Sequence, residues 1–540
     1  MPRTFNVAGP NKPDLHYTLD PEPRLPDLRA LIEQSNYFVV YAPPKSGKTT
    51  LMETLACKLT AEGRYIAIRF SLADGCQFKQ EGVESANLTI LDALKKTAQL
   101  VLSEPLRPPA NLFADSSLRF NDISHVFTQW TQQAPRPLVI FIDDIDMLEG
   151  EGLNAILSQV RSNYILRSQR AFPYSLAFIG TRDVREYRSQ INVDRKSFGD
   201  ATPFNIKAQS LQLANFNRTE VTALYQQHTE ETGQQWTDEA MARAYELTQG
   251  QPWLVNALAR QIIERDAIDR STTINAAHVN AAKETLILRR DTHIDSLAER
   301  LHEARVRRVI EPVLTGSFTG AEVYNDDLLY VADLGLTTRP PAQIKIANPI
   351  YAEVIPRSLS FVMQSNLPLQ QQWYVLTDGR LDMIKLLREF QQFFRRESEI
   401  WLERYEYKEA GPHLLLYAWL QRVVNGGGHL HRESALGNQR VDLLIEWPVT
   451  IDSTLRRWPI PPGVSIQREV LEVKLYRDKQ TEADGLEQLG NYLTALGEPA
   501  GHLLIFDRRL KRSWDKKIFR RDHVVLPAPH KNLYATIWGL

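Results

Sequence analysis

Residues 37–59 constrain the fold more than any other segment of the chain. They read YFVVYAPPKSGKTTLMETLACKL, in which an apolar run of strand length meets a short loop and then a helical pattern. Pro43 and Pro44 have no N–H group, so an anion must be held by the backbone donors from Ser46 to Thr49, at the start of the helix. The segment therefore predicts a phosphate-binding loop between a buried strand and a helix.

This loop has the spacing of a P-loop, with Ala42 in place of the first glycine and Gly47-Lys48-Thr49 at its end. We expect Lys48 to reach the β- and γ-phosphates of ATP and Thr49 to ligate Mg²⁺. A chance Gly-Lys-Thr at a helix start is the alternative, and the preceding strand and a second motif downstream count against it. The residues expected to line the nucleotide are Ala42, Pro43, Pro44, Lys45, Ser46, Gly47, Lys48, Thr49 and Thr50.

The second motif is PLVIFIDDIDML at 137–148, an apolar run that ends in acids. As in Walker B elements, we expect Asp143 to complete the Mg²⁺ shell and Asp144 to activate the attacking water. Two further apolar runs, at 65–70 and 175–180, alternate with helical patterns. Short apolar runs of this kind are typical of a buried parallel sheet, so the region predicts an α/β domain.

Two shorter motifs follow in order: TRD at 181–183 and Gly-x-Pro at 250–252. With the Asp-Asp pair they resemble the AAA+-related STAND ATPases of signalling and immunity. The resemblance implies that Arg182 senses the γ-phosphate, that Pro252 lies by the adenine, and that ATP binding drives assembly into homo-oligomers. Many AAA+ enzymes have glutamate where this chain has the shorter Asp144, so we expect slow hydrolysis. A solvated loop charge and a helix breaker are the alternatives for Arg182 and Pro252.

The organisation of the chain follows from where these patterns change. Its 540 residues allow about three or four domains. We expect an N-terminal arm and P-loop core at 1–208, a helical lid at 209–290, a winged helix at 291–365, and a linker helix with a last α/β domain at 366–540. The winged helix is suggested by a helix, two short strands and a proline-bounded turn. The predicted fold class is therefore a multidomain α/β protein.

Composition excludes some classes of function. The formal net charge is −1, so any contact with nucleic acid must come from local patches. The first residues lack the apolar core of a signal peptide, and no window approaches the length of a membrane span. Two cysteines, Cys57 and Cys76, cannot make a disulfide framework or a four-ligand zinc site. These features predict a cytoplasmic protein that has no membrane partner.

The last domain places an acid and a base inside an apolar strand pattern. In REVLEVKLY, Glu472 and Lys474 alternate with apolar residues, so the two side chains share one face of the strand. Upstream, Asp442 stands in the apolar second strand of an expected hairpin. Downstream, Gln488 and Tyr492 share a helix face because they are four residues apart. Taken alone, the Glu-x-Lys pair would indicate a solvated strand face, and the ordered set favours a site.

This set resembles the PD-(D/E)xK nucleases, in particular the branch with nuclease domains of bacterial recombination enzymes. Val441 stands where the name of the group has proline. The resemblance implies a restriction-endonuclease-like fold in which Asp442 and Glu472 hold Mg²⁺ or Mn²⁺ and Lys474 orients the attacking water. It also implies that the Gln-x-x-x-Tyr pair positions the phosphate of the strand. An inactive nuclease-like module is the alternative.

A basic run near the C-terminus adds a weaker signal for DNA. Residues 506–523 carry eight lysines and arginines against three aspartates, with aromatic residues between them. Together the patterns predict a nuclease switched by ATP that acts on DNA in prokaryotic defence against phage or mobile elements, with an unknown trigger. Two alternatives stay open: a regulatory DNA-binding ATPase whose C-terminal domain is inactive or a scaffold, and a DNA repair nuclease.

Overall fold

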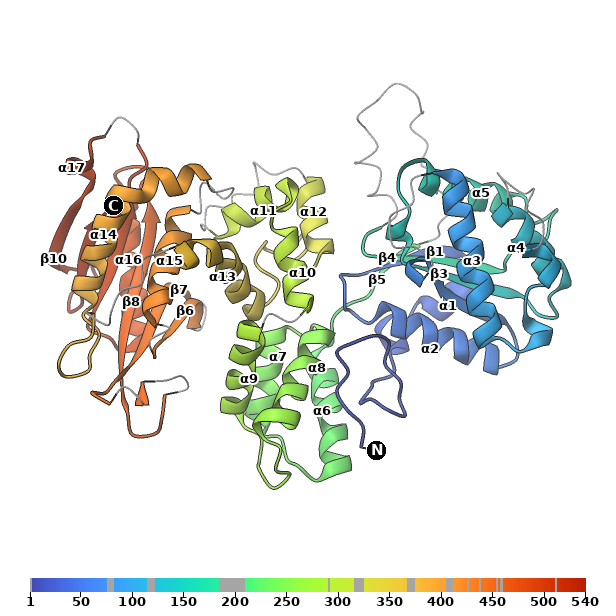
Figure 1. Cartoon of the computed structure of the whole chain (residues 1–540), viewed down its shortest axis with the longest axis horizontal. Coiled ribbons are helices and arrows are strands. Elements are labelled where there is room, and N and C mark those ends of the chain that lie inside the picture. The colour runs from blue at the N-terminus through green and yellow to red at the C-terminus, as the bar shows by residue number, and fades with distance from the viewer. Residues whose placement is uncertain are drawn as a thin grey trace. The chain divides into compact units, whose positions relative to one another are not determined.

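The computed structural model describes residues 2–74, 82–113, 122–183, 209–289, 292–314, 325–366, 374–404, 411–424, 427–436, 439–452, 455–456, 460–509 and 512–540. Figure 1 labels the helices and strands of the chain. The chain divides into two compact units. The first comprises 1–288 with 324–343, and the second comprises 289–323 with 344–540. The segment predicted to form a winged helix, 291–365, is therefore shared between the two units. None of the described helices is long and apolar enough to cross a membrane.

The first unit is built on a parallel five-stranded sheet in the order β2-β3-β4-β1-β5. The strands are β1 (Tyr37–Tyr41), β2 (Ile66–Ser71), β3 (Leu138–Asp143), β4 (Ser175–Gly180) and β5 (Gln209–Gln212). The first four coincide with the four apolar runs and confirm them as strands. The fifth was not predicted, because its sequence QSLQ is polar and buries only Leu211 at the edge of the sheet.

Helices cover both faces of this sheet, which explains why its strands are apolar without alternation. They are α1 (Leu28–Glu33), α2 (Lys48–Ala61), α3 (Val83–Val101), α4 (Asp122–Gln133) and α5 (Gly150–Ile165). Within β1, Val39 joins a core with α3, α4 and α5, whereas Phe38 joins a separate core with α1 and α2. Each face of the sheet therefore has its own hydrophobic core.

A helical lid follows the sheet, although residues 209–212, which the sequence assigned to the lid, form strand β5 of the sheet. Its helices are α6 (Arg218–Thr232), α7 (Asp238–Thr248), α8 (Pro252–Gln261) and α9 (Ala276–Arg289), and α12 (Asn325–Asp333) belongs to the same unit. Asn217 starts α6 through a capping box with Glu220. The N-terminal arm packs on the lid, where Phe5 lies 5.6 Å from the Tyr225 ring and 6.1 Å from the His228 ring.

The second unit begins with helices α10 (Thr292–Arg300), α11 (Ala304–Leu314) and α13 (Pro349–Asn366). The two short strands expected between 325 and 366 do not form in the described part of that segment. Only Thr337 and Ile346 occupy bridge positions there. Pro340 and Pro341 lie between them and lack the N–H donors that a strand ladder requires.

The rest of this unit is a mixed six-stranded sheet in the order β10-β11-β9-β8-β7-β6. The strands are β6 (His429–Leu436), β7 (Gln439–Val449), β8 (Ser465–Leu475), β9 (Ala500–Phe506), β10 (Phe519–Val525) and β11 (Tyr534–Gly539). The antiparallel pairing of β6 with β7 confirms the predicted hairpin. Helix α16 (Thr481–Leu496) connects β8 to the parallel β9.

Helices pack on both faces of the second sheet. Leu489 and Leu493 of α16 share a core with Val470 and Leu503, which lie on one face. On the other face, Phe394 of α14 (Met383–Arg404) lies 5.0 Å from the Phe506 ring. Helix α15 (Gly411–Val424) packs beside α14, where the Phe393 and Trp419 rings stack at 5.1 Å. Among the polar residues of β8 that lie on the α16 face, Glu472 is fully buried, whereas the Lys474 side chain is 24% exposed.

Candidate functional site

The phosphate-binding loop bends sharply between β1 and α2. Lys45 and Gly47 have positive φ angles of 62° and 93°, and Gly47 caps the helix that starts at Lys48. The Lys48 Nζ donates to the carbonyl oxygens of Ala42 and Pro43 at 2.7 and 3.0 Å. The lysine is thus folded onto its own loop, and the first N–H groups of α2 have no helical partner. The loop has the donors and the charge that a phosphate group requires.

The charges of three acids of the β3 motif act on Lys48. Burial lowers the pKa of Lys48, and the charges of Asp146, Asp143 and Asp144 act against that shift. The Thr49 Oγ1 donates to Asp143 Oδ2 at 3.0 Å. The two residues expected to hold Mg²⁺ with ATP are therefore in direct contact, where the start of α2 meets the end of β3.

An arginine that the sequence did not single out completes this contact. Arg69, in β2, donates from Nε and Nη2 to Asp143 Oδ2 at 3.0 and 2.7 Å. The Asp144 N–H donates to the other carboxylate oxygen of Asp143 at 2.9 Å. The Asp143 side chain is 1% exposed, so its charge is compensated inside the protein. One signal was present in the sequence: Arg69 is the only charged residue in the apolar run YIAIRF.

Asp144 and Asp146 point to different neighbours. Asp144 has a φ of 57° and accepts a hydrogen bond from the Ser71 hydroxyl. Burial raises the pKa of Asp144, and the charge of Asp143 raises it further. Asp146 Oδ2 accepts from the N–H of Thr181 at the end of β4, at 2.7 Å. The role of Asp144 in activating water stays a prediction.

The Gly-x-Pro segment contacts the phosphate-binding loop through its middle residue, Gln251. Gln251 Nε2 lies 3.4 Å from the Lys45 carbonyl oxygen, and the Gln251 side chain caps α8, which begins at Pro252. Gly250 has a φ of 69°, and a β-carbon there would stand 1.8 Å from the Phe216 carbonyl oxygen. Only glycine fits this joint between the β5–α6 connection and the lid.

Arg182 lies at the end of β4, as the strand pattern predicts. Its side chain is buried, and its guanidinium lies 4.8 Å from the ring centroid of Tyr330 in α12. The adjacent Thr181 is the residue that contacts the β3 acids, through Asp146. The role of Arg182 as a γ-phosphate sensor stays a prediction.

Arg24 is a second residue of this site that the sequence did not reveal. Its Nη2 donates to the Ser46 carbonyl oxygen at 3.2 Å and also to the carbonyl oxygen of Ala214. Its guanidinium lies 4.7 Å from the ring centroid of Phe216. Burial lowers the pKa of Arg24 to about 10. Arg24 therefore links the phosphate-binding loop to the start of the lid, across a separation in sequence that no local pattern could indicate.

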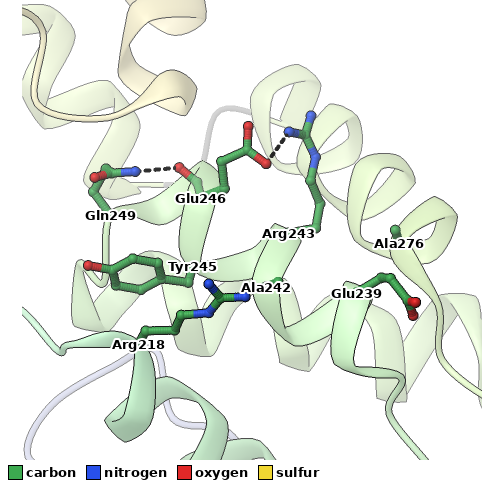
Figure 2. A pocket seen from close by; sticks show the side chains of 8 residues that line it. All are labelled: Arg218, Glu239, Ala242, Arg243, Tyr245, Glu246, Gln249 and Ala276. Carbon is green, nitrogen blue, oxygen red and sulfur yellow. Dashed lines mark hydrogen bonds and ion pairs between the residues drawn. The ribbon is translucent and has the colours of Figure 1, made fainter. Parts of the chain in front are cut away.

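The lid also carries an open pocket of about 580 Å³ (Figure 2). Arg243 pairs with Glu246 at 2.8 Å, and Gln249 donates to the Glu246 carbonyl oxygen at 2.8 Å. No residue predicted from the sequence lines this pocket. We therefore assign it no role in binding the nucleotide.

In the second unit, the structure brings together four of the five predicted nuclease residues. Asp442 of β7 lies opposite Glu472 of β8, because the ladder pairs Leu443 with Leu471. The Lys474 Nζ lies 2.6 Å from Glu472 Oε1 and also donates to Gln488 Oε1 of α16. The pairing of Asp442 with Glu472 and the contact of Lys474 with Gln488 each join elements that are separate in sequence.

The fifth predicted residue, Tyr492, lies one helical turn beyond Gln488 and is buried in the core beside Leu444 and Val470. Asp442 Oδ2 accepts from the Val473 N–H at 2.9 Å. The acid is thereby fixed against β8. The catalytic and metal-binding roles of these residues stay predictions.

The environment of Glu472 fits a divalent cation. The side chain is 0% exposed, and neither carboxylate oxygen has a well-directed hydrogen bond, although Lys474 is close. Burial raises the pKa of Glu472 well above its usual value, and the Asp442 charge raises it further. Two carboxylates share this site with one ammonium group, so negative charge is in excess. Carboxylate oxygens are the ligands that Mg²⁺ and Mn²⁺ prefer. Asp442 and Glu472 are therefore suited to hold such an ion.

Comparison with known proteins identifies one part of the chain. The family model AAA, described as ATPase family associated with various cellular activities, matches residues 38–168. The chain therefore contains an AAA ATPase domain, and ATP use is implied for it. No curated protein sequence matches the chain.

Two solved structures show the extent of structural similarity. The Walker-type ATPase paby2304 of Pyrococcus abyssi is similar with a TM-score of 0.46 at 12% identity, over 65% of this chain and 99% of that one. The RuvB Holliday junction branch migration motor of Thermotoga maritima has a TM-score of 0.32 at 16% identity, over 61% of this chain and 90% of that one.

Proposed function

We propose that this protein is a nuclease that cleaves DNA phosphodiesters with Mg²⁺ and is switched by a STAND-like AAA ATPase module. The observation that carries the proposal is the pair Asp442 and Glu472, one of them fully buried, with Lys474 ion-paired to Glu472 at 2.6 Å. A buried carboxylate beside a second carboxylate is costly unless a cation compensates the charge. A strand face that only meets water would not place Glu472 out of reach of solvent.

The nuclease residues divide the work by their chemistry. Asp442 and Glu472 would hold the Mg²⁺ or Mn²⁺ ion, which when bound activates water and stabilises charge on the phosphate. Lys474 is a compact cation that orients the water and balances the developing negative charge. Gln488 accepts a hydrogen bond from Lys474, which holds the ammonium group near the carboxyl end of β8.

The switch is supported by contacts within the first unit. Arg24 and Gln251 both reach carbonyl oxygens of the phosphate-binding loop, and each is attached to the lid by a second contact or by its own helix. A nucleotide that reshapes the loop would therefore bias the lid. A shift from a mostly closed to a mostly assembled state requires about 5 kcal/mol of difference between ATP and ADP in their affinity for the two states. The combination fits defence against phage or mobile elements in a prokaryotic cytoplasm.

One experiment tests the nuclease assignment. The full chain is incubated with plasmid or single-stranded DNA and Mg²⁺ or Mn²⁺, with and without ATP. We expect Asp442→Ala, Glu472→Ala and Lys474→Ala each to abolish cleavage while ATP binding is retained. Glu487→Ala is the matched control, because Glu487 is exposed on α16 beside Gln488.

The outcomes separate the candidate functions. Loss of cleavage in the three variants, with the control active, supports the assignment. If all three variants still cut DNA, the assignment fails. A wild-type chain that binds DNA and hydrolyses ATP but never cuts would instead indicate a regulatory ATPase with an inactive nuclease-like domain.

A further inference from the structure

The carboxyl end of β9 lies beside the candidate nuclease residues. In the parallel ladder Lys474 pairs with Ile505, and the Tyr476 N–H donates to the Phe506 carbonyl oxygen at 2.8 Å, so the pairing continues past Lys474. Side chains alternate along strands, so Tyr476 and Asp507 lie on the face that carries Lys474. At a rise of about 3.3 Å per residue, Tyr476 lies about 7 Å beyond Lys474 along the sheet.

Asp507 organises two arginines at this end of the sheet. It accepts from Nε and Nη2 of Arg509 at 2.9 and 2.6 Å, and from Nη1 of Arg512 at 3.0 Å. The Asp507 side chain is 6% exposed, whereas those of Arg509 and Arg512 are 45% and 37% exposed. One buried carboxylate therefore holds two accessible guanidinium groups, and the cluster keeps a net positive charge.

Tyr476 holds one of these guanidinium groups flat. Arg509 lies 3.9 Å from the ring centroid of Tyr476, and Tyr476 packs against the core under α16. A guanidinium has five N–H donors, and Asp507 accepts from the Nε and Nη2 edge of Arg509. The geometry is fixed before a ligand arrives, which reduces the entropy lost on binding.

Two other arginines of the same basic run are matched one to one with acids. Arg520 pairs with Asp522 at 2.7 Å, and Arg521 pairs with Glu482. These pairs are locally neutral. The pairing therefore sets these two neutral pairs apart from the Asp507 cluster, in which two arginines share one carboxylate.

We propose that Arg509 and Arg512, oriented by Asp507 and Tyr476, dock the phosphate backbone of the DNA strand that is cut. The inference rests on the proposed nuclease function and specifies where its substrate lies. Guanidinium groups bind phosphate through paired donors, and the flat face of Arg509 suits contact with a base. The docked strand runs from the carboxyl end of β9 to Lys474.

The test measures binding of a fluorescein-labelled single-stranded DNA oligonucleotide by anisotropy, on the full chain with Glu472→Ala to prevent cleavage. Arg509→Ala and Arg512→Ala should each weaken binding about tenfold and reduce the slope of log affinity against log salt by about 0.7. Arg512→Lys, which keeps the charge, should recover part of the affinity. Arg395→Ala is the matched control. Arg395 is an exposed arginine of α14, which covers the opposite face of the sheet, and it pairs with Asp515 at 3.1 Å.

A second readout uses chains that keep Glu472. The docking variants should raise KM and leave kcat nearly unchanged, since the groups that carry the chemistry are intact. Unchanged affinity, salt slope and KM in both arginine variants would overturn the docking site while the nuclease assignment stands. Absence of both cleavage and oligonucleotide binding in chains with intact arginines would overturn both proposals together.

Discussion

Arg69→Met tests whether the AAA ATPase domain carries its own counter-ion for the Walker B acid. The substitution removes the guanidinium that donates twice to Asp143, and it keeps an unbranched stem of similar length. Asp143 would retain Thr49 and the Asp144 N–H as donors, but its charge would have no arginine beside it. The side chains of Arg69 and Asp143 are 15% and 1% exposed, so solvent cannot replace the lost charge.

Removing one partner of a buried ion pair costs about 3–5 kcal/mol, and we expect about 3 because both Asp143 oxygens keep a donor. For a domain of this size, that loss corresponds to a melting temperature lower by roughly 6–12 °C. Mg²⁺ with ATPγS would place positive charge near Asp143 again. The stabilisation by Mg²⁺ and nucleotide should therefore be larger in Arg69→Met than in the wild type.

The assay is scanning fluorimetry of the full chain, following the transition that shifts when Mg²⁺ and ATPγS are added. Arg64→Met is the matched control, because Arg64 forms an exposed pair with Glu33 at 3.3 Å and such pairs contribute little. The double variant Arg69→Met/Asp143→Asn should be more stable than Arg69→Met alone, since no buried charge is left unpaired. Equal, small losses for Arg69→Met and Arg64→Met, or strict additivity in the double variant, would refute the reasoning.

Three further predictions concern the same unit. Lys48→Ala should weaken ATP binding and silence DNA cleavage, whereas Asp144→Asn should bind ATP, hydrolyse it slowly and cleave DNA at least as well as wild type. Calorimetry measures the binding, phosphate release the hydrolysis and plasmid digestion the cleavage. Equal hydrolysis rates for Asp144→Asn and wild type would mean that another acid activates water. Gly250→Ala should lower the free energy of unfolding in urea titration by several kcal/mol, because its β-carbon would stand 1.8 Å from a carbonyl oxygen. Gly233→Ala is the control: its φ is 78° but nothing lies near the added β-carbon, so backbone strain alone should cost about 1 kcal/mol. Equal losses in the two variants would contradict the clash. Burial lowers the pKa of His228 from 6.5 to about 4, so the free energy of unfolding should be highest above about pH 6.5 and fall by about 3 kcal/mol as the pH drops toward 4. His228→Gln should flatten this pH dependence. A wild-type curve that is already flat would contradict the prediction.

The AAA ATPase domain could be recognised from sequence because its signals are local. The phosphate-binding loop depends on nine consecutive residues between a strand and a helix, and the Walker B acids follow their own strand directly. Such a segment carries both its conformation and its chemistry in contiguous sequence. The alternation of Glu472 and Lys474 with apolar residues was equally local, and their shared face was confirmed by the ion pair between them.

The charge partners were decided by the tertiary structure. Arg69 and Asp143 are 74 residues apart, and Arg24 and Ala214 are 190 residues apart, so no period or spacing connects them. The complete burial of Glu472 depends on α16 and on the register of β7 against β8, which sequence does not specify. The basic run near the C-terminus shows the same limit, since composition counts its charges while only the fold places Arg509 and Arg512 on one shared carboxylate. Electrostatic energy depends on distance in space and on exclusion of water, and folding alone determines both.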